Sequence, residues 1–500
     1  MFRRTALAAT ALLAALTLAI TGCGPGEEPA PAPSGKPNAS ASVAIRLALA
    51  PSNLDIRTTA GVAVDQVLID NVYQGLVSRT PDQKIVPALA SDWEVSPDGL
   101  TYTFTLEDGV VFHDGQELTA DDVVWSLTTR KNTPEWSESD RLARVSEIAA
   151  EGQTVTLTLT EPDSSLMWNL TGRAGIILKT DDTVNYQTDA NGTGPFMVAN
   201  WKEGDSVTLT RFEDYWGDPA QVAEVVFPFI TDTQAAINAA LAGEVDVVTG
   251  FEAPLTEQIT AEGTFTVTTG SATDKSVLAM NSTAAPLDDE RVRQALRMAI
   301  DHDAIVSAIG SGSTLFGPIP KPDPGYQDLS EVISFDPAAA KELLAEANAE
   351  DLTLTLTTPS FYPPTAAQIL VSNFDEIGIT LKVESVEFAT WINDVYKNQD
   401  YQLSLINHAE PRDFENWANP DYYFTYDNPE VQELYQQSLA STDEDESAQL
   451  LAKAAKTVSE DHAADWLYNW ASVVAVGTNI SGMPIDNVNS RINLAEISKR

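Results

Sequence analysis

The chain has 500 residues and a formal net charge of −44 at neutral pH, with 73 acidic and 29 basic side chains. Such a charge is repelled by phosphate backbones and anionic headgroups, which excludes nucleic acids and bare lipid surfaces as partners. One cysteine cannot form an internal disulfide, so a buried core must stabilise the fold, and the length predicts two or three domains.

The first 22 residues have the layout of a secretory signal peptide, because Arg3 and Arg4 precede an apolar run over 6–20. That run is shorter than the about 20 residues a transmembrane helix needs. It leads into Thr-Gly-Cys23, which resembles the lipobox of bacterial lipoproteins, where the cysteine is lipidated and becomes the new N-terminus. The resemblance implies attachment through a lipid on Cys23 to the outer face of the cytoplasmic membrane, in the extracytoplasmic space. Residues 23–42, rich in Gly, Pro, Ala and Ser, predict a flexible linker.

Alternating apolar residues predict strands in the folded part, which begins near residue 43. Over 101–106, Tyr, Phe and Leu alternate with threonines, and Asp-Gly pairs at 108–109 and 114–115 predict turns. The same alternation recurs over 155–159 and 352–356. Threonines along one side of each strand predict sheets with one face in water.

Helix signals lie between these strands. Thr119 and Asp122 are spaced as a capping box that begins a helix. Apolar residues at 292, 295, 296, 299 and 300 predict an amphipathic helix with acids at its start. Asp301 is expected to cap a second helix that ends at Gly310. Strands and helices interspersed in this way predict an α/β or α+β class.

Four segments, taken in order, resemble the family 5 extracellular solute-binding proteins of ABC importers, a group that includes oligopeptide, dipeptide and nickel binders. The segments are Pro-Ala-Leu-Ala-Ser-Asp-Trp at 87–93 with its continuation to 123, Gly-Thr-Gly-Pro-Phe at 192–196 with Asp-Tyr-Trp-Gly at 214–217, Ala-Gly-Glu-Val-Asp at 242–246, and the stretch 280–301. The resemblance runs from about residue 43 to the end of the chain.

This resemblance implies an α/β fold of the periplasmic-binding-protein type (type II, cluster C), with two main lobes, a hinge and an inserted third domain. Domain I is expected to be discontinuous over 43–78, 191–275 and 475–500. Domain II is the insertion, 79–190, and domain III covers 276–474. Ligand would be enclosed between domains I and III as they close about the hinge.

Residues 401–414 correspond to the ligand-binding stretch of the family. In peptide-binding members, an aspartate late in domain III pairs with the peptide α-ammonium, and Asn407 stands at that position here. An amide brings no charge, so Glu410 or Asp413 could supply it from a shifted position, or the ligand has no free ammonium there. Solvated loop acids are the alternative interpretation. The strand 403–406 could offer its backbone to an extended peptide.

Five further residues are candidates for ligand contact. Trp417 and Trp470 are predicted to form an aromatic wall, with core packing as the alternative. Gly61 and Val62 lie where the family's domain I segment faces the ligand. His408 is the candidate for contact with a chelated metal, as nickel binders of the family use a histidine in the cleft.

No zinc-binding, nucleophile-elbow or phosphate-loop motif occurs in the sequence, so we expect neither an enzyme, a resident metal nor a cofactor. The leading hypothesis is a monomeric lipoprotein that captures di- and oligopeptides by hinge closure and passes them to ABC permease subunits in the membrane. One alternative is a binding protein for a nickel or other metal chelate, or for another non-peptide solute such as a sugar. An exported hydrolase with an unrecognised site is the other.

Overall fold

The computed structural model describes residues 36–500, so the predicted signal peptide, Cys23 and residues 24–35 of the predicted linker lie outside the described residues. Within 36–500, no helix combines the length and the apolar character needed to cross a bilayer.

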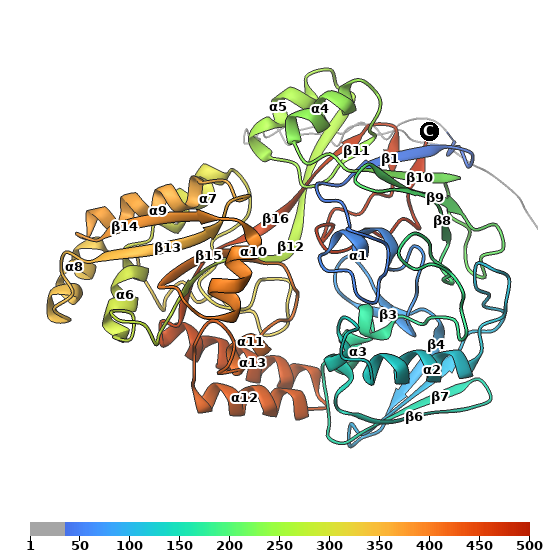
Figure 1. Cartoon of the computed structure of the whole chain (residues 1–500), viewed down its shortest axis with the longest axis horizontal. Helices are drawn as coiled ribbons and strands as arrows, with labels where there is room; N and C mark the ends of the chain where they lie inside the picture. The colour runs from blue at the N-terminus through green and yellow to red at the C-terminus, as the bar shows by residue number, and fades with distance from the viewer. Residues whose placement is uncertain (1–35) are drawn as a thin grey trace, which may run out of the picture. The chain divides into compact units, whose positions relative to one another are not determined.

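A ten-stranded mixed sheet is the main structural element (Figure 1). Its strands, in spatial order, are β14 (Thr380–Val386), β13 (Thr353–Pro359), β15 (Leu403–His408), β12 (Phe265–Met280), β16 (Ala464–Gly477), β11 (Val247–Val248), β1 (Ser42–Arg46), β10 (Glu224–Pro228), β9 (Ser206–Arg211) and β8 (Phe196–Lys202). Strand β1 pairs in parallel with β10 and β11, and β13 pairs in parallel with β14 and β15. The mixture of pairings confirms the α/β class.

Two long antiparallel strands, β12 and β16, join the two halves of this sheet. Their register shifts between Ser271 and Lys275, where a bulge interrupts the pairing. On one side of the bulge β16 pairs with β11, and on the other β12 pairs with β15. The Asn469 side chain donates hydrogen bonds to the carbonyls of Ala272 and Asp274 inside the bulge. A bulge bends a strand locally and increases its twist.

A separate four-stranded antiparallel sheet carries the first predicted strands. Its order is β4 (Ala90–Val95), β5 (Thr101–Leu106), β7 (Thr154–Leu159) and β6 (Val145–Glu151). Tyr102, Phe104 and Leu106 point into a buried core, as the alternation predicts. Two short pairs complete the strands: β2 (Val77–Arg79) with β3 (Ile85–Pro87), and β17 (Ile480–Ser481) with β18 (Ser498–Lys499).

Thirteen α-helices are present in residues 36–500. They are α1 (Ala63–Leu68), α2 (Ala120–Lys131), α3 (Leu166–Asn169), α4 (Thr233–Leu241), α5 (Thr256–Thr260), α6 (Glu290–Met298), α7 (His302–Ile309), α8 (Pro337–Glu346), α9 (Thr365–Glu376), α10 (Phe388–Trp391), α11 (Glu415–Ala418), α12 (Pro429–Ala440) and α13 (Glu444–Glu460). Short 3₁₀ turns occur at Ser139–Leu142, Arg173–Gly175 and Ala253–Leu255, and a π-helical turn at Ile392–Lys397.

The predicted helix boundaries are confirmed by their caps. The Thr119 hydroxyl accepts from the Asp122 backbone N–H, and the Asp122 carboxylate accepts in return, which starts α2. Asp289 caps α6, and Asp301 caps α7. Gly310 ends α7 at φ 80°, a left-handed conformation that glycine adopts without strain.

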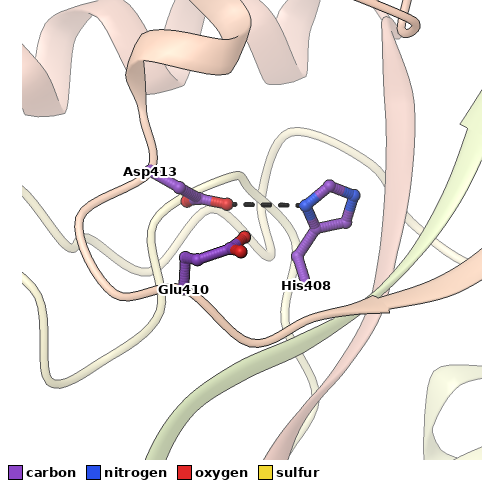
Figure 2. Close-up of side chains that lie close together, drawn as sticks. All are labelled: His408, Glu410 and Asp413. Carbon is purple, nitrogen blue, oxygen red and sulfur yellow. Dashed lines mark ion pairs between the residues drawn. The ribbon is translucent and has the colours of Figure 1, made fainter. Parts of the chain in front are cut away.

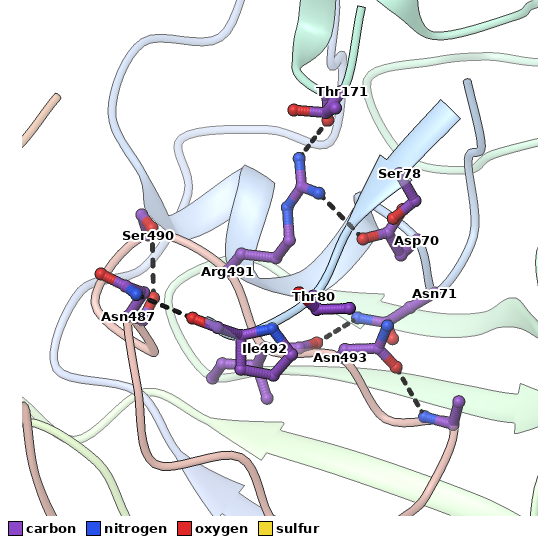
Figure 3. Close-up of polar contacts among 12 residues, drawn as sticks. Asp70, Asn71, Ser78, Thr80, Thr171, Asn487, Ser490, Arg491, Ile492 and Asn493 are labelled. Carbon is purple, nitrogen blue, oxygen red and sulfur yellow. Dashed lines mark hydrogen bonds and ion pairs between the residues drawn. The ribbon is translucent and has the colours of Figure 1, made fainter. Parts of the chain in front are cut away.

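The C-terminal segment 487–494 is hydrogen-bonded to α1 and to the residues that follow it, and Figure 3 shows part of this network. Asn71 donates to the Ile492 carbonyl and accepts from the Leu494 N–H, while Gln66 donates to the Val488 carbonyl. Arg491 bonds the Thr171 carbonyl and lies 3.0 Å from Asp70. Residues more than 400 positions apart in sequence therefore meet here, which brings the end of the chain to the cavity described next.

Candidate ligand-binding site

One cavity of about 120 Å³ is lined by six segments of the chain. Its lining residues are Val62, Asp65, Ile69, Arg79, Glu138, Arg141, Trp168, Asn169, Gly172, Arg173, Ala409, Glu410, Pro411, Arg412, Ser490 and Arg491. These come from the start of α1, the end of β2, the segments 138–141 and 168–173, the loop after β15, and the C-terminal segment. Clefts formed by several segments of this kind are preferred ligand sites.

Arg173 holds the first of these segments in place. Its guanidinium lies 2.6 Å from an Asp65 carboxylate oxygen and donates to the carbonyls of Thr59 and Gly61. Burial raises the pKa of Asp65 to about 6, although Arg173 opposes the rise. Gly61 has φ 88° and contributes its carbonyl to Arg173, while the next residue, Val62, lines the cavity.

The loop after β15 brings together His408, Glu410 and Asp413, whose ligand-type atoms lie within 4.8 Å of one another (Figure 2). Two of the three are already engaged. Asp413 forms a buried ion pair with Lys275 at 2.7 Å, and the His408 Nε2 lies 2.8 Å from the Tyr423 hydroxyl. Glu410 is exposed and lines the cavity.

Electrostatics favour an ionised Asp413. Burial alone would raise its pKa, but the positive charge of Lys275 and the contact with His408 at 3.6 Å outweigh burial and lower the pKa to about 2. Lys275 also opposes a divalent cation at this point, because the cation would have to approach a buried ammonium group.

Asn407, in strand β15, is not among the residues that line the cavity. Its side-chain nitrogen donates to Asp274 at 3.2 Å, and its backbone N–H donates to the Tyr362 hydroxyl at 3.2 Å. Its side-chain oxygen is buried and has no hydrogen-bond partner in residues 36–500. Its assignment to the ammonium position stays a prediction.

The two tryptophans differ in their environment. Trp417 is 1% exposed and stacks on Phe424 at 4.0 Å inside a hydrophobic core, away from the residues that line the cavity. Trp470 is half-buried, and its ring lies 5.2 Å from that of Tyr468. Neither lines the cavity, so the aromatic wall stays a prediction that this packing does not support.

Sequence reasoning missed most of the cavity's charged residues. Arg412 lies in the same segment as Glu410 and Asp413. A basic residue between these two acids is a signal in the sequence that could have marked Arg412 as a candidate. No signal in the sequence marked Arg79, Trp168 or Arg491, because only the fold brings these distant positions together.

Direct contacts also join the segment before β6 and the segment after β7 to helices α11 and α12. Arg141 lies 2.5 Å from Glu415, and the Ser164 N–H donates to the Leu439 carbonyl at 2.8 Å. A second, larger cavity of about 330 Å³ lies along this contact and is lined by Arg144, Glu161, Pro162, Glu433, Gln436, Gln437 and Ala440. It contains none of the predicted ligand residues, so we place the candidate site in the smaller, arginine-lined cavity.

A sequence model of the bacterial extracellular solute-binding proteins, family 5 (middle part), matches residues 84–430. The chain belongs to this family. The dipeptide-binding protein of Escherichia coli K12 is 27% identical over 406 residues, which cover 73% of this chain and 74% of that relative.

Solved structures share the fold of this family 5 protein. The periplasmic binding protein DppA of Helicobacter pylori, in complex with the peptide STSA, superposes with a TM-score of 0.78 at 23% identity, over 92% of this chain and 98% of that one. NikA of Staphylococcus aureus, in complex with Ni(L-His)2, superposes with a TM-score of 0.77 at 21% identity, over 92% and 100%. These likenesses confirm the predicted periplasmic-binding-protein fold.

Proposed function

We propose that this extracellular solute-binding protein captures short peptides in the arginine-lined cavity and passes them intact to an ABC permease. The observation that carries the proposal is that this cavity exposes unpaired charges of both signs. Glu410, Arg79 and Arg412 all line it and make no ion pair with any residue in 36–500. A free peptide is a zwitterion, so it can satisfy both sets of charges at once.

In this proposal Glu410 receives the peptide ammonium. It is exposed in the cavity and follows the strand β15, whereas Asp413 is neutralised by Lys275 and Asn407 bonds Asp274. The family's charged ammonium partner would thus be supplied three residues after Asn407. The name and ligand of the relatives from Escherichia coli and Helicobacter pylori support a peptide as cargo.

Capture would proceed by closure at the bulge between Ser271 and Lys275. The parts that move relative to one another would be the predicted domains. These are domain I over 43–78, 191–275 and 475–500, domain II over 79–190, and domain III over 276–474. The Arg141–Glu415 contact joins domains II and III of this scheme and would stabilise the closed form. Because binding needs only closure, we propose no bond-breaking step.

The remaining parts of the proposal concern where the protein acts. A lipid on Cys23 would hold it at the outer face of the cytoplasmic membrane, with residues 24–37 as a tether, and the protein would act as a monomer. The predicted linker reached to residue 42, but Asn38 and Ala41 are hydrogen-bonded to the folded part and β1 begins at Ser42. Replacement of Cys23 by serine, followed by fractionation of cells into membrane and soluble material, tests the anchor. We expect the variant to leave the membrane fraction, and persistence there would refute lipidation at this residue.

A metal chelate is the second candidate, because the atoms of His408, Glu410 and Asp413 meet the spacing of a metal site. A nickel–histidine complex is bound by the similar structure from Staphylococcus aureus. The Lys275–Asp413 ion pair favours the peptide over this alternative, since a metal would have to displace the ammonium group.

Thermal unfolding with a pool of di- to tetrapeptides, compared with nickel–histidine at the same concentration, separates the two candidates. A ligand at one hundred times its Kd stabilises the folded state by about 2.7 kcal/mol. We expect the unfolding temperature to rise with the peptide pool and to be unchanged by nickel–histidine. A rise with nickel–histidine alone would reject the peptide assignment.

A further inference from the structure

The loop between β7 and α3, residues 160–165, contacts the end of α12. The Ser164 backbone N–H donates to the Leu439 carbonyl at 2.8 Å, and the Ser164 hydroxyl donates to the Ser438 carbonyl at 3.0 Å. Both carbonyls belong to the last turn of α12, where helix carbonyls have no partner within the helix. Ser164 therefore caps a helix from which it is separated by 274 positions in the chain.

The start of α13 completes this contact. The Ser447 hydroxyl donates to the same Ser438 carbonyl at 2.9 Å and lies 3.3 Å from the Ser164 hydroxyl. Ser438 and Ser447 are buried, at 1% and 8% exposed. All of these bonds are between neutral groups, whose net contribution to stability is modest because water can replace either partner. The contact can therefore form and separate reversibly.

The loop is fixed in shape before it reaches α12. The Asp163 carboxylate accepts from the Ser165 N–H at 3.0 Å and from the Ser165 hydroxyl at 2.6 Å. The Tyr102 hydroxyl donates to the Asp163 carbonyl at 3.1 Å, and Arg144 donates to the Pro162 carbonyl at 2.9 Å. A preorganised loop loses little conformational entropy when it docks.

Two further contacts lie beside Ser164. Gly99, at φ 67°, packs so closely on the turn between α12 and α13 that an added Cβ would lie 2.8 Å from the Thr442 methyl group. Arg144 donates to the Gln436 side chain at 2.7 Å. The cavity of about 330 Å³ is lined mostly by charged and amide side chains and separates the rest of the two surfaces. Small polar interfaces of this kind are typical of domains that move relative to one another.

We propose that the loop 160–165 is a latch, which docks on α12 and α13 and holds the closed form together in the absence of ligand. Its contact residues are Gly99 and Ser164 on one side and Ser438, Thr442 and Ser447 on the other. None of the five lines the candidate ligand cavity, so the latch sets how often the protein closes without touching the ligand. This inference rests on the proposed function in one respect, namely that capture proceeds by closure.

The distance between two spin labels measures docking without any ligand. Cys23→Ser removes the natural thiol, and Ala149→Cys and Lys456→Cys supply two labelling sites that are exposed on β6 and α13. Pulsed electron spin resonance then gives the distribution of distances between the two labels. We expect a short-distance population, from docked molecules, in the ligand-free protein.

Two substitutions weaken the latch in different ways. Ser164→Ala removes the hydroxyl donor and should lower the ratio of docked to undocked molecules by about 2- to 10-fold, as expected for one neutral hydrogen bond. Gly99→Phe places a ring against Thr442 and should move most molecules to longer distances.

Each substitution has a matched control in the same sheet. Ser146→Ala also removes a hydroxyl that donates to a carbonyl, at 2.9 Å, but its partner Thr158 lies within the sheet. Gly109→Phe carries the same left-handed strain as Gly99→Phe, at φ 74°, but no atom lies within 4 Å of the added Cβ. Both controls should give the distances of the parent protein. Circular dichroism melting curves check that every variant is folded.

Ligand-free distances as long in the parent as in Gly99→Phe would overturn the latch, as would equal distributions for the parent and Ser164→Ala. Calorimetric titration of the same variants with Ala-Ala-Ala separates this inference from the proposed function. Absence of peptide binding with the pattern of distances intact would reject the proposed function alone. Peptide binding with equal distances in all variants would reject the latch alone.

Discussion

The buried Lys275–Asp413 pair offers the sharpest test of how the loop after β15 is built. Both side chains are nearly inaccessible, at 1% and 5% exposed, and their charged atoms are 2.7 Å apart. Replacing Lys275 by methionine leaves the Asp413 carboxylate buried without its cation. Removal of one partner of such a pair costs about 3–5 kcal/mol of unfolding free energy. Replacing both residues, as in Lys275→Met/Asp413→Leu, should restore most of the unfolding free energy. A protein with apolar residues in place of a buried ion pair is often about as stable as the protein with the pair.

Urea unfolding followed by tryptophan fluorescence measures the effect. With an m-value of about 2–3 kcal/mol per M, the single substitution should lower the midpoint by about 1–2 M. A single variant within about 0.5 kcal/mol of wild type would refute the reasoning, because Asp413 would then not depend on Lys275.

The same pair predicts a pH dependence. The pKa of Asp413 is about 2 in the folded protein, against an ordinary value of 3.8, so the unfolded chain takes up the proton first as pH falls. The contribution of Asp413 to stability is therefore complete above about pH 4 and is lost as pH falls toward 2. In Lys275→Met, burial raises the pKa of Asp413 above its ordinary value instead, so the stability gap to wild type should begin to narrow above pH 4 and continue to narrow toward pH 2. A gap that stays constant down to pH 2 would contradict this assignment.

Three further predictions follow from individual contacts. Trp417→Ala should lower the unfolding free energy by about 3–5 kcal/mol in urea titrations, because Trp417 is a core residue. A variant that is as stable as wild type but binds ligand more weakly would instead support Trp417 as part of the aromatic wall. Gly192→Ala should lower the unfolding free energy by more than about 3 kcal/mol, or prevent folding as judged by circular dichroism, because a Cβ would lie 1.9 Å from the Val72 carbonyl oxygen. A melting curve like that of wild type would contradict this prediction. Glu415→Ala, outside the cavity lining, should weaken peptide affinity by about twofold to fivefold in calorimetry, because the half-exposed Arg141–Glu415 ion pair would stabilise the proposed closed form only modestly; an affinity equal to wild type would mean that the contact plays no part in closure.

Local signals in the sequence predicted the elements well. The capping pair Thr119 and Asp122, the N-cap Asp301 and the terminating Gly310 each act over four residues or fewer, so their geometry is set by neighbours in the chain. The alternation over 101–106 likewise predicted β5 with its correct buried face. The fold as a whole required the resemblance to the family, because the pairing of β12 with β16 joins residues about 200 positions apart.

The candidate site was predictable only in part. Val62 and Glu410 were named from the sequence, and both line the cavity. Asp413 was named as a possible partner of the ligand ammonium or a solvated loop acid, but it is buried and forms an ion pair with Lys275, which lies far away in sequence. The arginines at 79 and 412 could not be linked from the sequence, because their common neighbour Trp168 lies on a third segment.

Native mass spectrometry of the purified protein, exchanged against a defined pool of di- to tetrapeptides, tests the central claim most directly. We predict one adduct per chain with the mass of an unmodified peptide, and a bias toward peptides with a free carboxylate. Spectra without peptide adducts at any concentration tried, or with only cleaved products bound, would contradict a protein that captures peptides and releases them intact.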